Sequence, residues 1–199
     1  MRLLVLIFVF FVGIDAKSLK LNNAGYYWRD WNVGDPIPVD AITGGITNKG
    51  HKTYIARTVY PQVGVIVPGK VSENDRKMWF EFDNAEHESI KDVSILCSLN
   101  HERFHWILTN MGNHISEVEN NHQKLILAAY DRPKPVAIGR KKLGDVVHIG
   151  KVVIDPVTNK FLDMRVTEDG RGWGVTNKYE VLVYDNQEDD SESMVLEFY

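Results

Sequence analysis

The sequence has few of the devices that commonly stabilise small extracellular proteins. It contains one cysteine, Cys97, so no intrachain disulfide can form. It also contains no Asn-x-Ser/Thr site for N-glycosylation. Cys97 ends the apolar segment 93–97, which predicts a buried thiol, the alternative being an intermolecular link. The folded chain must therefore be stabilised by an apolar core.

Clustered positive charge and long apolar runs are also scarce. The net charge is −4 and no stretch is rich in Lys and Arg, which argues against nucleic-acid binding. The apolar run at residues 3–12 follows Arg2 and precedes the small residue Ala16. At about 10 residues it is too short to span a bilayer. We expect a signal peptide at residues 1–16 and a secreted, extracellular protein with no membrane span; the alternative is an N-terminal anchor helix.

Helical periodicity is weak, and short β-rich runs bounded by Gly, Pro, Asn and Asp recur instead. Such runs, separated by turn residues, are typical of all-β proteins. The segment 116–124 is rich in Asn and Glu and predicts a polar loop. The predicted strands are 53–60, 63–67, 78–82, 93–97, 125–129, 146–149, 152–154 and 179–184.

Three landmarks occur twice, in the same order and roughly 80 residues apart, which indicates an internal repeat. They are a strand ending in arginine, a Gly-Lys-Val motif and an apolar closing strand. The pairs are 53–57 with 135–140, 69–71 with 150–152, and 93–96 with 179–182. Two copies are too few for an open solenoid, so we expect them to pack against each other.

The predicted fold class is all-β, with two tandem pseudo-symmetric repeats forming one β-sandwich-like domain. The domain covers residues 17–185, with repeat one at about 26–97 and repeat two at about 104–185. Residues 186–199 form an acidic and then apolar C-terminal tail.

These motifs resemble the DM-nine repeat family, secreted invertebrate proteins that include mannose-binding lectins and a module of natterin-like proteins. The resemblance covers residues 26–185. It includes the aromatic opening at 26–31, the segment 37–41, the Pro-Gly-Lys-Val at 68–71 and the closing segment 179–185. It implies an all-β, two-repeat fold with exchanged strands and, in some members, sugar binding and dimerisation.

The resemblance further implies that a sugar is held by the acid of a Gly-Gly-x-Asp turn and the lysine of Pro-Gly-Lys. Asp131 and Lys151 match these positions in repeat two. In repeat one Lys70 is present, but Thr47 replaces the acid, so Thr47 or Asn48 would have to supply acceptors. A carboxylate and an ammonium can together bind a sugar diol. The alternative for Asp131 and Lys151 is an exposed salt bridge.

Arg57 and Arg140 occupy matched positions in predicted strands. Each is a candidate ligand or anion contact through its planar guanidinium. The structural alternative is an arginine that ties a bulge or pairs with an acid such as Asp131.

No pattern for catalysis, metal binding or cofactor binding stands out. There is no Gly-x-Ser-x-Gly motif and no Gly-rich cofactor loop. His101, His105 and His114 lie close in sequence, but no cysteine completes a zinc set. We therefore expect neither an enzyme nor a metal or cofactor site.

The sequence favours a secreted, mannose-type lectin-like protein, in a role such as innate recognition, with the sugar held in repeat two. The alternative is an extracellular protein-interaction or structural protein whose sugar site has decayed. The expected partners are accordingly glycans or an extracellular protein, with a homodimer as a further expectation.

Overall fold

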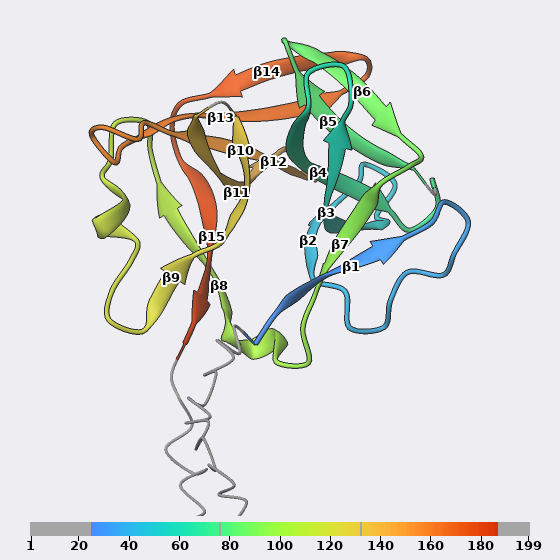
Figure 1. Ribbon diagram of the computed structural model, residues 1–199, viewed down its shortest axis with the longest axis horizontal. Coiled ribbons are helices and arrows are strands. Elements are labelled where there is room, and N and C mark those ends of the chain that lie inside the picture. Colours follow the sequence, from blue (N-terminus) through green and yellow to red (C-terminus); the bar gives the residue numbers. More distant parts are fainter. Residues whose placement is uncertain (1–24, 76, 132, 187–199) are drawn as a thin grey trace, which may run out of the picture.

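The computed structural model describes residues 25–75, 77–131 and 133–186. The described chain consists of strands joined by turns and two short 3-10 helices, so the all-β prediction is confirmed (Figure 1). The predicted signal peptide and C-terminal tail lie outside the described residues, except for Asn186.

We call residues 25–97 the first half and residues 104–186 the second half, with η1 (His101–Arg103) between them. The first half contains β1 (Tyr27–Trp31), β2 (Thr43–Ile46), β3 (Lys52–Tyr60), β4 (Val65–Ser72), β5 (Met78–Phe82), β6 (Ala85–Ser89) and β7 (Val93–Cys97). The second contains β8 (Phe104–Thr109), η2 (Ile115–Glu117), β9 (Gln123–Leu125), β10 (Leu127–Asp131), β11 (Lys134–Leu143), β12 (Val146–Ile154), β13 (Phe161–Glu168), β14 (Arg171–Val175) and β15 (Tyr179–Asp185).

Each predicted strand overlaps an observed one, with two differences. The separate strands predicted at 146–149 and 152–154 are one continuous strand, β12, which runs through Gly150. The polar loop predicted at 116–124 begins within η2 and ends in the short strand β9.

The strand pairings of the second half follow those of the first. In each half the arginine-bearing strand, β3 or β11, lies between the Gly-Lys-Val strand and the closing strand. Arg57 of β3 lies opposite Ser94, and Arg140 of β11 lies opposite Glu180. The outer strands β1 and β8 then pair with the closing strands β7 and β15. Positions in the two halves therefore correspond residue by residue.

The centre of the sheet closes on itself. Eight strands form a ring in the order β2, β3, β4, β5, β6, β14, β13 and β12. The ring closes because β2 pairs with β12 through Ile46 and Val147, and β6 with β14 through Ala85 and Arg171. The sequence predicted a sandwich-like packing, whereas the structure has one continuous 15-stranded sheet (Figure 1).

The glycine of each Gly-Lys-Val motif permits a close approach of neighbouring strands. A Cβ on Gly69 would overlap the carbonyl oxygen of Trp79, and a Cβ on Gly150 would overlap that of Arg165. These are equivalent contacts, from β4 to β5 and from β12 to β13. Glycine is thus needed at both positions for the same steric reason.

The glycine pair of β2 lies at the seam of the ring. A Cβ on Gly45 would overlap the carbonyl oxygen of Val147, across the seam. In the second half Ala129 occupies the equivalent position and is buried with 6% exposure. Among the described residues β10 has no strand pairing with its neighbour β4, in contrast to the pairing of β2 with β12.

Three clusters of buried apolar side chains make up the core. One lies within the first half and one within the second. The third is shared, because it joins Ile42, Ile55 and Leu96 to Ile126 and Leu182. The two halves therefore have a common interior, as expected for a chain without disulfides.

Cys97 lies in the core of the first half, at 0% exposure, and the prediction of a buried free thiol is confirmed. Among the residues described, no helix has the length and apolar character needed to cross a bilayer.

Candidate functional site

Asp131 and Lys151, twenty positions apart in the sequence, line the same cavity, whose volume is about 350 Å³. Asp131 ends β10, and Lys151 lies in the middle of β12. Both halves contribute, because the hairpin between β5 and β6 forms the opposite wall. The polar residues that line the cavity are Glu81, Asp83, Asn84, Asp131, Lys134, Lys151, Asp163 and Arg165.

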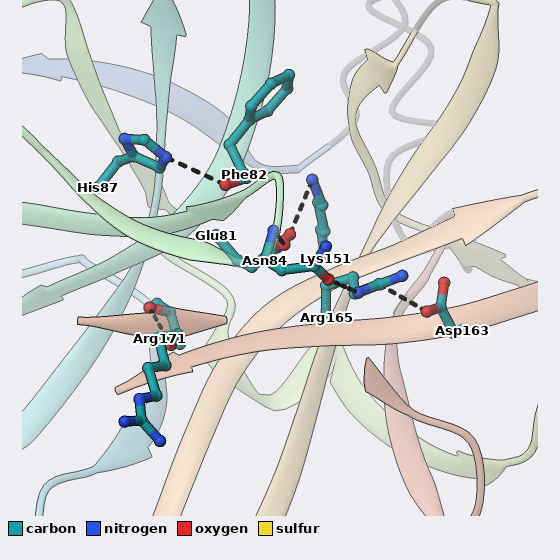
Figure 2. Close-up of polar contacts among 9 residues, drawn as sticks. Glu81, Phe82, Asn84, His87, Lys151, Asp163, Arg165 and Arg171 are labelled. Atoms are coloured by element: carbon teal, nitrogen blue, oxygen red, sulfur yellow. Dashed lines mark hydrogen bonds and ion pairs between the residues drawn. The ribbon is translucent and has the colours of Figure 1, made fainter. Parts of the chain in front are cut away.

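Lys151 is held in place by Glu81 of the first half. Its Nζ lies 3.0 Å from Glu81 Oε2, and the two side chains are 7% and 4% exposed. Figure 2 shows the pair spanning the space between the two halves. The Glu81 Oε1 atom accepts a hydrogen bond of 2.8 Å from the backbone N–H of Asn84. The carboxylate thus fixes both the lysine and the turn of the hairpin.

A second ion pair stabilises the wall formed by β13. Arg165 Nε lies 2.6 Å from Asp163 Oδ2, and Arg165 Nη1 donates a hydrogen bond of 2.5 Å to Asn84 Oδ1 (Figure 2). The guanidinium therefore links β13 to the hairpin of the first half. This leaves Arg165 in a defined orientation at the edge of the cavity.

Asp131 and Asp83 are the two carboxylates of the cavity for which no ion pair is recorded among the described residues. Asp131 is half-buried and lies opposite Lys134 in the β10–β11 ladder. Asp83 lies in the β5–β6 turn, where its φ of 51° is a left-handed conformation that aspartate tolerates. The cavity thus offers free acceptors next to fixed donors.

Lys70, the counterpart of Lys151, has a different environment. Its Nζ donates a hydrogen bond of 2.9 Å to the backbone carbonyl of Thr167. Thr167 occupies the position in β13 that Glu81 occupies in β5, so the lysine has a carbonyl partner where Lys151 has a carboxylate. Burial lowers the pKa of Lys70 below its usual value, although nearby carboxylates oppose the shift.

Thr47 and Asn48 lie in the turn after β2 and do not line the cavity. The Thr47 hydroxyl accepts a hydrogen bond of 3.1 Å from the backbone N–H of His51, which closes the turn. The sequence suggested that these residues replace the missing acid in a sugar site with Lys70, whereas Lys70 donates to the Thr167 carbonyl.

Arg140 pairs with an acid, as the structural alternative from the sequence predicted, but the acid is Glu180. Its Nε and Nη2 donate to Glu180 Oε2 and Oε1 at 2.7 and 3.1 Å. The expected acid, Asp131, is not this partner. The guanidinium carbon also lies 4.4 Å from the ring centroid of Trp106.

Arg57 stacks in the same way, 4.3 Å from the ring centroid of Trp28, which is equivalent to Trp106. Its Nη1 donates a hydrogen bond of 3.3 Å to the carbonyl of Ala128 in β10. Neither arginine lines the cavity that contains Asp131.

Six polar residues of the cavity belong to no motif of the sequence: Glu81, Asp83, Asn84, Lys134, Asp163 and Arg165. The strand registers make Glu81 of β5 and Thr167 of β13 equivalent positions, at which the two halves differ. In the part of the chain that the structure describes, no group of three or more His, Cys, Asp or Glu side chains is arranged to hold a metal ion.

Comparison with known proteins bears on the first half. Residues 19–89 match the family model of the DM9 repeat. The chain carries a DM9 repeat. The match includes Arg57, Lys70 and Glu81, whereas Asp131 and Lys151 lie outside it. No curated protein matches the sequence.

The fold of this protein is similar to that of the nematode sperm cell motility protein MFP2B, known from a crystal structure. The TM-score is 0.54 at 12% sequence identity, over 81% of this chain. The chain spans 45% of the length of that protein. The similarity is one of fold.

Proposed function

We propose that this DM9-repeat protein recognises carbohydrate in the cavity lined by Asp131 and Lys151. The observation that carries the proposal is that these two side chains, from β10 and β12 on either side of β11, line one polar cavity. A sugar presents neighbouring hydroxyls that both donate and accept hydrogen bonds. The Asp131 carboxylate accepts from two such hydroxyls, and the Lys151 ammonium donates to their oxygens.

The surrounding ion pairs favour this function because they hold the donors in place before a ligand arrives. The Glu81 carboxylate positions Lys151, and Asp163 positions Arg165. An ammonium has three N–H donors, so the pair with Glu81 leaves donors for a ligand. A preorganised polar site loses less side-chain entropy when it binds.

The finer aspects of the proposal are a mannose-type specificity, secretion and a role such as innate recognition. A small polar ligand exchanges contacts with water for contacts of similar strength, so one site binds weakly. A homodimer would present two such cavities and raise the avidity for a branched glycan.

We further infer that the two halves are copies of one repeat. The matched registers of Arg57 with Arg140 and Lys70 with Lys151 support this inference. If so, Lys70 and Lys151 derive from one ancestral lysine. Only the second half has an acid at the position of the Gly-Gly-x-Asp motif, Asp131, so only the second site is suited to bind a sugar diol.

The test is a glycan array on the purified protein, followed by titration calorimetry with methyl α-mannoside. Asp131→Asn removes the negative charge of this side chain and retains its shape. Asp145→Asn, in the exposed turn between β11 and β12, is the matched control. We expect Asp131→Asn to lose binding and Asp145→Asn to retain it. A wild-type protein that is folded by circular dichroism and binds no glycan would rule the proposal out.

A second candidate function is interaction with an extracellular protein. It is favoured by one observation, that two cations of the cavity already have partners within the chain, Lys151 with Glu81 and Arg165 with Asp163. Affinity capture from extracellular fluid tests it. A partner that binds wild type and Asp131→Asn equally, together with an empty glycan array, would support this function over the first.

A further inference from the structure

Arg57 and Arg140 occupy equivalent positions but differ in the residue that faces them. Opposite Arg140 lies Glu180, whose carboxylate accepts hydrogen bonds from two nitrogens of the guanidinium, at 2.7 and 3.1 Å. Opposite Arg57 lies Ser94, which carries no charge. The second half therefore supplies a hydrogen-bonded carboxylate to its arginine, whereas in the first half Asp30 acts on Arg57 only through its charge.

The Arg57 guanidinium retains unused donors. Its Nη1 donates a long hydrogen bond of 3.3 Å to the Ala128 carbonyl. Within the described residues no ion pair and no further hydrogen bond of this guanidinium are recorded. Burial lowers its pKa from the usual value, because solvent is partly excluded from the group. The Ser94 hydroxyl instead donates to Asp30 Oδ1, at 3.1 Å.

Arg57 lines a second cavity, of about 480 Å³, between β4 and β10. It is the one charged residue among those that line it, and the others are mainly apolar. Ile66, Leu127 and Tyr130 are 39%, 41% and 61% exposed. This volume lies within the range of sites for small organic ligands.

The second cavity is separate from the proposed sugar site. Tyr130 lines the cavity of Arg57, and Asp131 lines the cavity of Lys151. Successive side chains of a strand point to opposite faces, so β10 separates the two cavities.

We propose that the cavity of Arg57 binds a small amphipathic carboxylate, with one carboxylate on an aliphatic or aromatic body. The carboxylate takes the place that Glu180 takes at Arg140 and accepts from two guanidinium nitrogens. The apolar body lies against Ile66, Leu127 and Tyr130 and removes their exposed surface from water. Glu180 is thus an internal example of the contact that the ligand makes.

The experiment is titration calorimetry with decanoate, and with decan-1-ol as the uncharged control ligand. The double variant Ser94→Glu/Asp30→Leu gives Arg57 the neighbours of Arg140, since Leu108 of β8 is equivalent to Asp30. The introduced glutamate should then accept hydrogen bonds from the Arg57 guanidinium and so compete with a bound carboxylate. Asp30→Leu alone is the matched control, and Arg57→Met removes the guanidinium.

We expect wild type and Asp30→Leu to bind decanoate. Their affinity for decan-1-ol should be lower by at least about tenfold, because a charge-assisted hydrogen bond raises affinity by at least this factor. Ser94→Glu/Asp30→Leu and Arg57→Met should lose the preference for decanoate. If Arg57→Met does not fold, the double variant decides. Absence of decanoate binding to wild type, equal binding of decanol, or an undiminished preference in the double variant would overturn the proposal. Glycan binding by Asp131 is independent of these outcomes.

Discussion

Glu81 and Lys151 form an ion pair between the two halves of the molecule, 3.0 Å from Oε2 to Nζ and almost entirely out of solvent. Removing two charges from water costs free energy, which only their mutual attraction and the hydrogen bonds around them offset. Either charge alone would be left buried and uncompensated. The pair thus makes the position of the cavity lysine depend on the packing of the two halves.

We expect Glu81→Leu and Lys151→Met to lower the free energy of unfolding by about 3 kcal/mol each, because each leaves one buried charge without a partner. The double variant Glu81→Leu/Lys151→Met should be much closer to wild type. Urea denaturation followed by tryptophan fluorescence measures all three. Additive losses in the double variant would mean that the two charges do not depend on each other.

The glycines of the two Gly-Lys-Val motifs should be equally sensitive to substitution. Gly69→Ala places a methyl group against the backbone carbonyl of Trp79, and Gly150→Ala places one against that of Arg165. Neither carbonyl can move unless its strand shifts. We expect losses of about 2 kcal/mol or more in thermal or urea unfolding. Gly174→Ala is the control, because its nearest contact is the flexible end of the Asp163 side chain, at 3.1 Å. A control as damaging as the two test variants would contradict this steric explanation.

Cys97 should be unreactive in the folded protein. Burial, aided by the neighbouring Asp40, raises the pKa of its thiol to about 12, so almost no thiolate exists at pH 8. We expect a disulfide reagent such as DTNB to leave the native protein unmodified and to react with one thiol per chain after unfolding in urea. Rapid reaction without denaturant would show that the thiol is accessible.

Stability should fall in mildly acidic solution because of His148. Burial, and then the positive charge of Lys70, lower the pKa of this imidazole below its usual value of 6.5. As the pH falls below about 6.5, His148 therefore binds a proton in the unfolded chain but not yet in the folded chain. The free energy of unfolding then decreases until the pH reaches the lower pKa of His148 in the folded protein.

His148→Gln should remove that part of the pH dependence. The measurement is the free energy of unfolding of wild type and variant between pH 7.5 and pH 5, with the difference between the two curves as the readout. Parallel curves over this range would mean that His148 titrates alike in the folded and unfolded states.

Much of the fold could be predicted from the sequence, because the information is local. Strands such as β3 and β7 are rich in β-branched and apolar residues and are bounded by turns. The two Gly-Lys-Val motifs are at equivalent places because the same close strand contact requires glycine in both. The joint position of Asp131 and Lys151 was implied by the family resemblance rather than by spacing.

The ring and most of the cavity could not be predicted, because they depend on contacts between distant residues. Glu81 reaches Lys151, and Asn84 reaches Arg165, only after the two halves have packed. The strand that closes the ring, β2, is a Thr-Gly-Gly-Ile segment without apolar alternation. Nothing in that segment identifies β12 as its partner, and a sandwich is an equally reasonable prediction from the same strands.

The ring has two seams, at Ile46 with Val147 and at Ala85 with Arg171, each recorded as one paired position. Hairpins such as β3–β4 join neighbours in the chain, whereas the seams join residues separated by most of the domain. Long loops must close before the seams can form, so the hairpins are expected to fold first and the seams last. The same seams are where the native ring should open most easily, and hydrogen exchange at them should be faster than at the centres of β3 and β12. Residues of both halves line each of the two proposed cavities, so each cavity is complete only after the two halves have packed.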